Sequence, residues 1–190
     1  MNTPSFEQLE SRQMMSVSLT KSVLTITGTN KADAIYVQPI NGKLEVEFNG
    51  TVVKRLAFSK VKQVRISGLK GDDSIGATLP SNMTAFVDGG KGNDVISGGE
   101  GNDTLLGGDG NDILHGNGGN DTVNGGHGAD HMDGGDGDDY FPAADGYQDV
   151  IDGGDGKDFA RADAIIDKFG MVTDESLDVI TTVETTQTLA

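Results

Sequence analysis

The sequence predicts an all-β fold, a solenoid of short stacked strands, from three observations. Residues 89–163 consist of nine-residue units that repeat in phase. The 190-residue chain has 29 glycines, no tryptophan and 5% aromatic residues, too few large side chains for an ordinary globular core. The repeated segment also holds 17 acidic and 3 basic residues, and therefore most of the net charge of −16 of the whole chain. Such a segment is expected to stay unfolded until cations neutralise it.

The repeated segment keeps its phase over almost its whole length. Six consecutive units read GGKGNDVIS from Gly89, GGEGNDTLL from Gly98, GGDGNDILH from Gly107, GNGGNDTVN from Gly116, GGHGADHMD from Gly125 and GGDGDDYFP from Gly134. A degenerate unit at Ala143 has one extra residue and carries Gln148 where the aspartate of position 6 is expected, and GGDGKDFAR resumes the pattern at Gly153. An acidic linker is the alternative, but linker composition does not preserve a nine-residue phase.

Each unit combines glycines that form a tight turn with one carboxylate. Glycines at positions 1, 2 and 4 permit backbone angles that side chains forbid, and Asn117 also tolerates the left-handed region. Turn carbonyls and a carboxylate at position 6 suit Ca²⁺, which takes oxygen ligands in flexible loops. The candidate carboxylates are Asp94, Asp103, Asp112, Asp121, Asp130, Asp139 and Asp158, with Asp73 upstream. The candidate turn glycines are Gly89, Gly90, Gly92, Gly98, Gly99, Gly101, Gly107, Gly108, Gly110, Gly116, Gly118, Gly119, Gly125, Gly126, Gly128, Gly134, Gly135 and Gly137.

Position 8 supplies one apolar side chain from each unit. The series is Ile96, Leu105, Leu114, Val123, Met132, Phe141, Ile151 and Ala160. Because side chains alternate along a strand, positions 6 and 8 share a face and position 7 points outward. Each unit is therefore predicted to contribute one ligand and one core side chain.

These units resemble the repeats-in-toxin (RTX), or haemolysin-type, calcium-binding nonapeptide G-G-x-G-x-D-x-U-x. The resemblance implies a right-handed parallel β-roll with two nonapeptides in each coil and several bound Ca²⁺ ions, about four to six. Turns on one edge then lie 18 residues apart, which pairs Asp94 with Asp112, Asp103 with Asp121, Asp112 with Asp130, and Asp121 with Asp139. Asp139 pairs with Asp158 across the insertion, whereas Gln148 is expected to leave Asp130 without its next carboxylate.

The flanks predict irregular β caps at both ends of the roll, because a solenoid end exposes unpaired edges. Residues 1–16 are read as a leader or disordered segment, 17–88 as a β-rich cap with degenerate repeats, 89–163 as the roll, and 164–190 as a C-terminal cap and possible secretion signal. Within the first cap, GLKGDDSIG at Gly68 places Asp73 at the ligand position, 21 residues before Asp94, so that their pairing requires a three-residue bulge. GTNKADAIY at Gly28 keeps Asp33 but has Lys31 in place of a glycine, and is read as a vestige without metal.

Two pairs of turn residues predict hairpins in the first cap. Asn41-Gly42 and Asn49-Gly50 bracket the alternating residues Leu44, Val46 and Phe48. In the tail, Leu177, Val179, Ile180 and Val183 are expected to close the other end of the roll.

The sequence also predicts export from the cell. No run of 18 apolar residues is present, so no transmembrane segment is expected, and residues 1–15 lack the pattern of a secretory signal. The opening FEQLESR followed by Ser16 resembles a short leader of exported bacterial surface proteins. The RTX resemblance implies secretion by a type I or other non-classical route through an uncleaved C-terminal signal.

Composition and motifs narrow the function classes. The acidic charge argues against nucleic acid, the absence of cysteine excludes disulfides and thiolate sites, and no motif predicts an enzyme. We therefore expect a calcium-binding structural or interaction module. The alternative is a module that binds extracellular polysaccharide or another cell-surface component through the acid-free basic stretch of Lys54, Arg55, Lys60, Lys62, Arg65 and Lys70, although a solvated strand face is the simpler interpretation. His115, His127 and His131 are expected at the surface, outside the ligand set.

Overall fold

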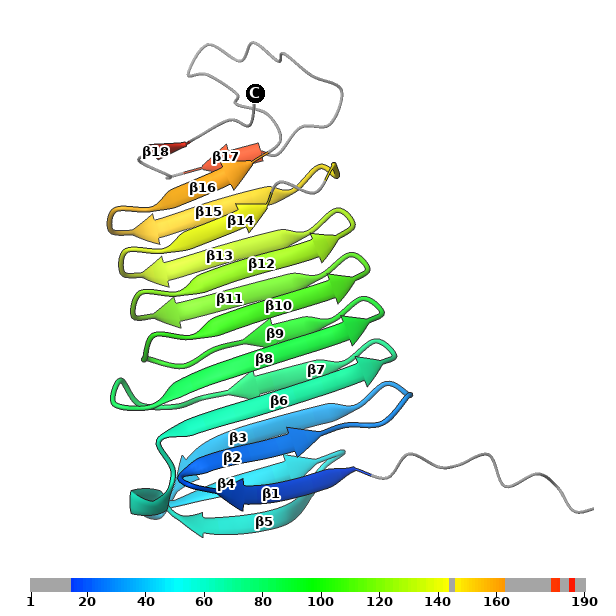
Figure 1. The fold of residues 1–190 in the computed structure, drawn as a ribbon, viewed down its shortest axis with the longest axis vertical. Helices are drawn as coiled ribbons and strands as arrows, with labels where there is room; N and C mark the ends of the chain where they lie inside the picture. The colour runs from blue at the N-terminus through cyan, green and yellow to red at the C-terminus, as the bar shows by residue number, and fades with distance from the viewer. Residues whose placement is uncertain (1–14, 144–145, 163–178, 182–184, 187–190) are drawn as a thin grey trace, which may run out of the picture.

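The computed structural model describes residues 15–143, 146–162, 179–181 and 185–186, and these form a β-solenoid of two stacked-strand sheets (Figure 1). The first sheet contains, in spatial order, β1 (Ser16–Thr20), β2 (Val23–Thr27), β6 (Gln63–Lys70), β8 (Thr84–Lys91), β10 (Thr104–Asp109), β12 (Thr122–His127), β14 (Tyr140–Ala143), β16 (Phe159–Ala162) and β18 (Thr185–Thr186). The second sheet contains β5 (Thr51–Ala57), β4 (Lys43–Phe48), β3 (Ala34–Ile40), β7 (Ser74–Ala77), β9 (Val95–Ser97), β11 (Ile113–Gly118), β13 (His131–Asp136), β15 (Val150–Asp155) and β17 (Val179–Thr181).

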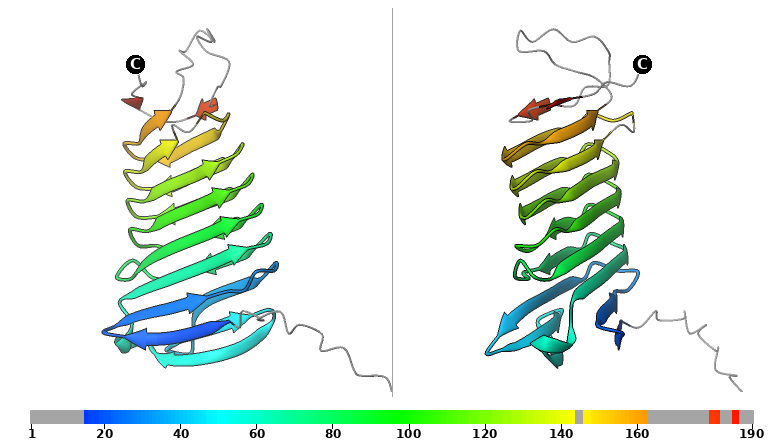
Figure 2. Two further views of the ribbon diagram at one scale, coloured as in Figure 1. Left: turned by 45° about the vertical axis from the view of Figure 1, so that its right-hand side comes forward. Right: turned by 60° about the vertical axis from the view of Figure 1, so that its left-hand side comes forward.

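The two sheets confirm the predicted all-β parallel roll. Successive strands of one sheet are parallel and belong to successive coils, so the chain alternates between the sheets (Figure 2). Leu105 of β10 pairs with Val123 of β12, and Leu114 of β11 pairs with Met132 of β13, which is the predicted 18-residue register. Parallel stacking starts upstream of Gly89, since β2 pairs with β6 and β3 pairs with β7.

The core of the roll is thin, because its main apolar side chains come from position 8 alone. All eight position-8 side chains are fully buried: Ile96, Leu105, Leu114, Val123, Met132, Phe141, Ile151 and Ala160. Position 7 points outward, as predicted, with Val95 at 44% and Ile113 at 41% exposure. The next inward position on most roll strands is a glycine, such as buried Gly107 after Leu105, which adds no side chain to the core. On β14 it is buried Ala143.

The N-terminal cap has a thicker apolar core than the roll. Four of its strands each bury two aliphatic side chains: Leu24 and Ile26 on β2, Ile35 and Val37 on β3, Leu44 and Val46 on β4, and Val64 and Ile66 on β6. Antiparallel β1 closes the first sheet, antiparallel β4 and β5 close the second, and the 3-10 helix η1 (Phe58–Lys60) leads from β5 toward β6.

The predicted hairpins of the cap are confirmed. Asn41 and Gly42 connect β3 to β4 with φ of 50° and 74°, and Asn49 and Gly50 connect β4 to β5 with φ of 48° and 75°. Two consecutive left-handed residues match the right-handed twist of the flanking strands, and Asn and Gly adopt that conformation most readily.

Between β6 and β16, two short insertions interrupt the 18-residue register without breaking the sheets. β6 pairs with β8, and β7 with β9, at an offset of 21 residues, so the predicted three-residue bulge exists. The extra residues lie in the connection from β7 to β8, on the opposite edge from Asp73. The second insertion gives an offset of 19 between β13 and β15.

At the C-terminal end, β17 adds to the second sheet beside β15, and β18 adds to the first sheet beside β16. Val179 and Ile180 lie in β17, whereas Leu177 and Val183 fall outside the described residues. The predicted leader at 1–16 falls outside them up to residue 14, and so does most of the predicted signal at 164–190. Among the described residues, no helix has the length and hydrophobicity to cross a bilayer.

Candidate metal centre

The turns of the roll place one buried aspartate on each edge of every coil. Six carboxylates precede strands of the second sheet and are called the long ladder: Asp33, Asp73, Asp94, Asp112, Asp130 and Asp149. Four precede strands of the first sheet and are called the short ladder: Asp103, Asp121, Asp139 and Asp158. All ten are at most 5% exposed. The structure therefore lines up every predicted carboxylate in two rows.

Hydrogen bonds fix the spacing within each ladder. The main-chain N–H of Asp94 donates to Oδ1 of Asp112, and that of Asp112 donates to Oδ1 of Asp130, both at 2.7 Å. In the short ladder, Asp103 and Asp121 donate in the same way to the following aspartate at 2.7 Å. Every pair predicted from the sequence lies together, including Asp73 with Asp94 at 2.7 Å and Asp139 with Asp158 at 3.0 Å.

The second carboxylate oxygen has no protein partner in five rungs. Oδ2 of each of these residues is buried and accepts no hydrogen bond: Asp73, Asp94, Asp112, Asp121 and Asp139. Each Oδ2 points at the glycine of position 1 in its own turn, so that a side chain on Gly89 would overlap Oδ2 of Asp94. Position 1 is glycine because the carboxylate occupies the space that a Cβ would fill.

Burial raises the pKa of these carboxyls. The pKa of Asp73, Asp112 and Asp121 rises to about 7 and that of Asp139 to about 6, because the charged form loses water and neighbouring aspartates on the ladder repel it. Burial also raises the pKa of Asp94. A buried carboxylate whose second oxygen has no donor is stabilised by either a proton or a cation.

The interior turns have left-handed residues at positions 2 and 4, a conformation called open below. Gly108 and Gly110, at positions 2 and 4, have φ of 123° and 147°, and side chains there would overlap the carbonyl oxygens of Gly90 and Gly92 one coil earlier. Asn117 takes position 2 with φ of 75°, as its tolerance of the left-handed region predicts.

The donor set suits calcium. No group of three or more histidine, cysteine or acidic side chains able to hold a metal gathers within the described ranges. Carbonyl oxygens together with a carboxylate form the hard, all-oxygen set that Ca²⁺ prefers over Zn²⁺. An ion held by Oδ2 and the turn carbonyls of adjacent coils would neutralise the buried charge and link the coils.

The assignment of Gln148 to position 6 is wrong. Val150 pairs with His131, which places Asp149 beside Asp130, and the N–H of Asp130 donates to Oδ1 of Asp149 at 2.9 Å. Asp149 is 1% exposed, whereas Gln148 is exposed. The extra residue therefore lies before position 6, and the expected gap in the long ladder does not exist. The sequence did contain a signal for Asp149: position 8 always follows the carboxylate by two residues, and Ile151 is the position-8 residue of this unit.

A second row of polar side chains was missed by the sequence reasoning. At position 5, Oδ1 of Asn93 accepts from the N–H of Asn111 at 2.8 Å, and Oδ1 of Asn102 accepts from the N–H of Asn120 at 3.0 Å. Here the side chain accepts from the following coil, whereas each ladder aspartate accepts from the preceding one. The signal was the asparagine at position 5 in four consecutive units. These contacts satisfy exposed turn N–H groups without a metal.

The remaining candidates lie at the surface, as predicted. His115 and His127 are 42% and 70% exposed and lie 3.4 Å from Asp133 and Asp109, while His131 is also exposed. The six basic residues between Lys54 and Lys70 are all exposed. Arg55 pairs with Glu45 at 2.6 Å, and the guanidinium of Arg65 lies 4.2 Å above the ring of Phe86.

Comparison with protein families agrees with this geometry. The family model of the RTX calcium-binding nonapeptide repeat matches residues 86–114, 106–141 and 143–164. This chain carries RTX repeats. Comparisons with curated proteins and with solved structures find no match. The RTX segment coincides with strands β8 to β16, where both edges of the roll carry a ladder, and it includes the unit with Asp149.

Proposed function

We propose that this chain is a secreted protein whose RTX turns bind Ca²⁺, that binding folds the roll, and that the folded roll acts as a structural or interaction module. The five buried Oδ2 atoms without protein partners, three in the long ladder and two in the short one, support the proposal. The roll cannot be compact with these charges uncompensated, since most of its strands bury a single apolar side chain. The ion supplies the missing stabilisation.

The strength of calcium binding determines where such a protein can fold. Extracellular calcium modules bind with Kd of roughly 10⁻⁴ to 10⁻³ M, so millimolar calcium contributes only about 0.4–1.4 kcal/mol per site. Several sites must act together to fold the roll. We infer that the roll is unfolded in a low-calcium cytoplasm and folds outside the cell.

Removing one interior carboxylate tests this role. Asp112→Asn keeps an oxygen for the N–H of Asp94 but removes a charge that adjoins both Asp94 and Asp130. We expect the calcium midpoint of folding, followed by far-UV circular dichroism, to rise severalfold and the titration to become less steep. The control is Asp136→Asn, which removes the same charge from an exposed position 3.

The midpoint and the two variants each test a part of the proposal. A wild-type circular dichroism spectrum that is unchanged by calcium would contradict calcium-driven folding. A midpoint below micromolar calcium would contradict folding outside the cell. Equal shifts in Asp112→Asn and Asp136→Asn would show that bulk charge, not the ladder, controls the transition.

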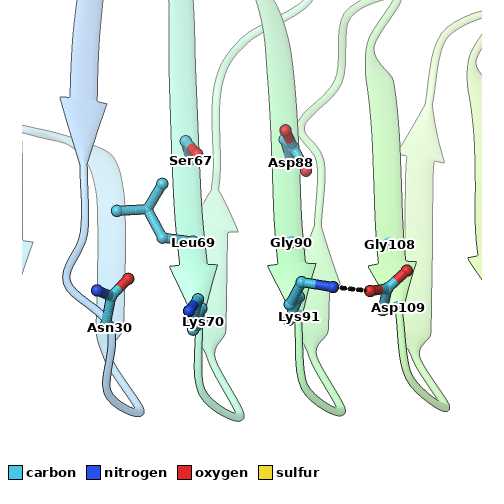
Figure 3. Close-up of a pocket in the computed structure, with 9 residues that line it drawn as sticks. All are labelled: Asn30, Ser67, Leu69, Lys70, Asp88, Gly90, Lys91, Gly108 and Asp109. Atoms are coloured by element: carbon cyan, nitrogen blue, oxygen red, sulfur yellow. Dashed lines mark hydrogen bonds and ion pairs between the residues drawn. The ribbon is translucent and has the colours of Figure 1, made fainter.

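A groove on the outer face of the first sheet favours a second candidate function, binding of an acidic polysaccharide (Figure 3). Its volume is about 370 Å³, and it is lined by Asn30, Ser67, Leu69, Lys70, Asp88, Gly90, Lys91, Gly108 and Asp109. Lys91 pairs with Asp109 in the next strand, which leaves Lys70 as the cation of the groove without such a partner in the view of Figure 3. The ammonium of Lys70 suits the carboxylate of a sugar acid, and the polar groups of Asn30, Ser67 and Asp88 beside Leu69 suit its hydroxyls.

Replacement of the groove lysine tests the second candidate. Lys70→Glu is expected to abolish retention of the calcium-loaded chain on polygalacturonate beads, because it reverses the charge facing the ligand. Lys157→Glu, at an exposed turn of the roll, is the matched control and should bind like the wild type. Retention that is equal in all three proteins would contradict the groove as the site, and absence of wild-type retention would contradict this ligand class.

A further inference from the structure

Two ladder aspartates differ from the five whose Oδ2 accepts no hydrogen bond, because a protein donor occupies this oxygen. Oδ2 of Asp103 accepts from the N–H of Gly99 at 2.6 Å. Oδ2 of Asp33 accepts from the N–H of Thr29 at 2.6 Å and from its hydroxyl at 2.9 Å. In both cases the donor lies four residues before the aspartate, at position 2 of the same turn.

These two residues are the N-terminal ends of the two ladders. Beyond Asp103, the residue in register one coil earlier is Ala85, whose N–H donates to Oδ1 of Asp103 at 2.6 Å. Beyond Asp33, the second sheet continues only with antiparallel β4 and β5. The same internal hydrogen bond therefore closes the first turn on each edge.

The backbone of the Asp103 turn also departs from that of its neighbours. Gly99 and Gly101 lie outside the left-handed region, whereas Asn117 and Gly119, at the same positions one coil later, have φ of 75° and 102°. In interior turns the main-chain N–H of position 4 donates to the following coil, as when Gly110 donates to the carbonyl of His127 at 2.8 Å. The Asp103 turn instead accepts a hydrogen bond from the following coil, since the N–H of Gly118 donates to the carbonyl of Gly99 at 3.1 Å.

The preceding coil explains the closed conformation. The Asp103 turn packs against the longer connection from β7 to β8, where Glu100 donates to the carbonyl of Leu79 at 2.7 Å. A side chain on Gly99 would collide with the backbone of Leu79 and Ala77, and Leu79 itself is buried. Without a glycine turn on that side, no pair of open turns forms. This happens although GGEGND from Gly98 matches the repeat pattern better than GNGGND from Gly116, the turn one coil later, does.

We propose that the calcium array ends at a closed turn on each edge, where Asp33 and Asp103 are held by protein donors, and that ions bind only from the Asp73 and Asp121 turns onward. This inference rests on the proposed calcium binding, and it departs from the sequence expectation that Asp103 and Asp121 hold an ion together. The turn at Asp103 thus serves as a metal-free end stop for the short ladder.

Anomalous diffraction from calcium-saturated wild-type crystals tests the inference without any mutation. Peaks are expected between the turns of Asp94 and Asp112 and between those of Asp121 and Asp139, with none between those of Asp103 and Asp121. A peak at the Asp103 turn equal to the others would overturn the inference and leave calcium binding intact. No peak at any turn would overturn the proposed function and this inference together.

A pair of variants on the same ladder gives an independent measurement in solution. Asp103→Asn should leave the number of bound ions counted by native mass spectrometry unchanged, whereas Asp121→Asn should reduce it by at least one. Asp103 accepts two main-chain hydrogen bonds, so its replacement lowers stability with and without calcium, but the ion count does not depend on that loss. A lower count in Asp103→Asn than in the wild type would contradict the closed turn.

Discussion

Removal of calcium with EDTA is expected to abolish amide protection in β9 to β16 and to leave β2, β3, β4 and β6 protected. The four cap strands each bury two aliphatic side chains, and each such side chain contributes about 1.5–3 kcal/mol. Most roll strands bury one, β14 adds only the small Ala143, and Oδ2 of Asp94, Asp112, Asp121 and Asp139 lacks a protein donor. Hydrogen exchange of the whole chain, with peptides resolved by mass spectrometry, measures the difference.

The same exchange experiment contains its own controls. Peptides from the cap report on global unfolding, and Mg²⁺ in place of Ca²⁺ reports on charge screening, because Mg²⁺ fits flexible carbonyl cages poorly. Protection that persists in β12 and β13 under EDTA would contradict calcium-driven folding of the roll. Uniform loss along the chain would contradict an independently stable cap.

The repeat fixes most of the roll because each position has one physical role. Position 8 is buried in every unit, position 7 is outside, and the carboxylates stack at the predicted spacing. The cap was predictable where turn chemistry is explicit, as at Asn41-Gly42. It was not predictable at the turn between β1 and β2, where Lys21 and Ser22 adopt φ of 49° and 68° without any glycine or asparagine.

Two parts of the site depend on neighbours that a single unit does not encode. Asp149 replaces Gln148 because strand pairing, not spacing from Ala143, sets the register across the insertion. The Asp103 turn matches the repeat pattern but takes another conformation, because the coil before it presents a longer connection instead of a glycine turn. Turn conformation in a stack is therefore a property of two coils, and only the structure specifies the second one.

Acidification is expected to fold the roll in the absence of calcium. Burial, together with repulsion from Asp94 and Asp130, raises the pKa of Asp112 to about 7, and the pKa of Asp121 is similarly raised, whereas an unfolded aspartate has a pKa of about 3.9. A carboxyl with a raised folded-state pKa binds its proton more tightly in the folded state, so its stabilisation is complete below about pH 4 and is lost as pH rises through about 7.

Protons and calcium are thus alternative ways to neutralise the same oxygens, and each should displace the other. In EDTA, far-UV circular dichroism of the wild type should show β structure and a cooperative thermal transition near pH 4.5, and neither at pH 8. Calcium binding to the acid-folded roll near pH 4.5 should release protons, measured by calorimetry in buffers of different ionisation enthalpy, and calcium affinity should fall as pH decreases. Asp112→Asn should release fewer protons than Asp136→Asn, because only the first removes a buried carboxyl. Apo protein that stays unfolded at every pH, or calcium binding without proton release, would refute the exchange of protons for calcium at the ladder.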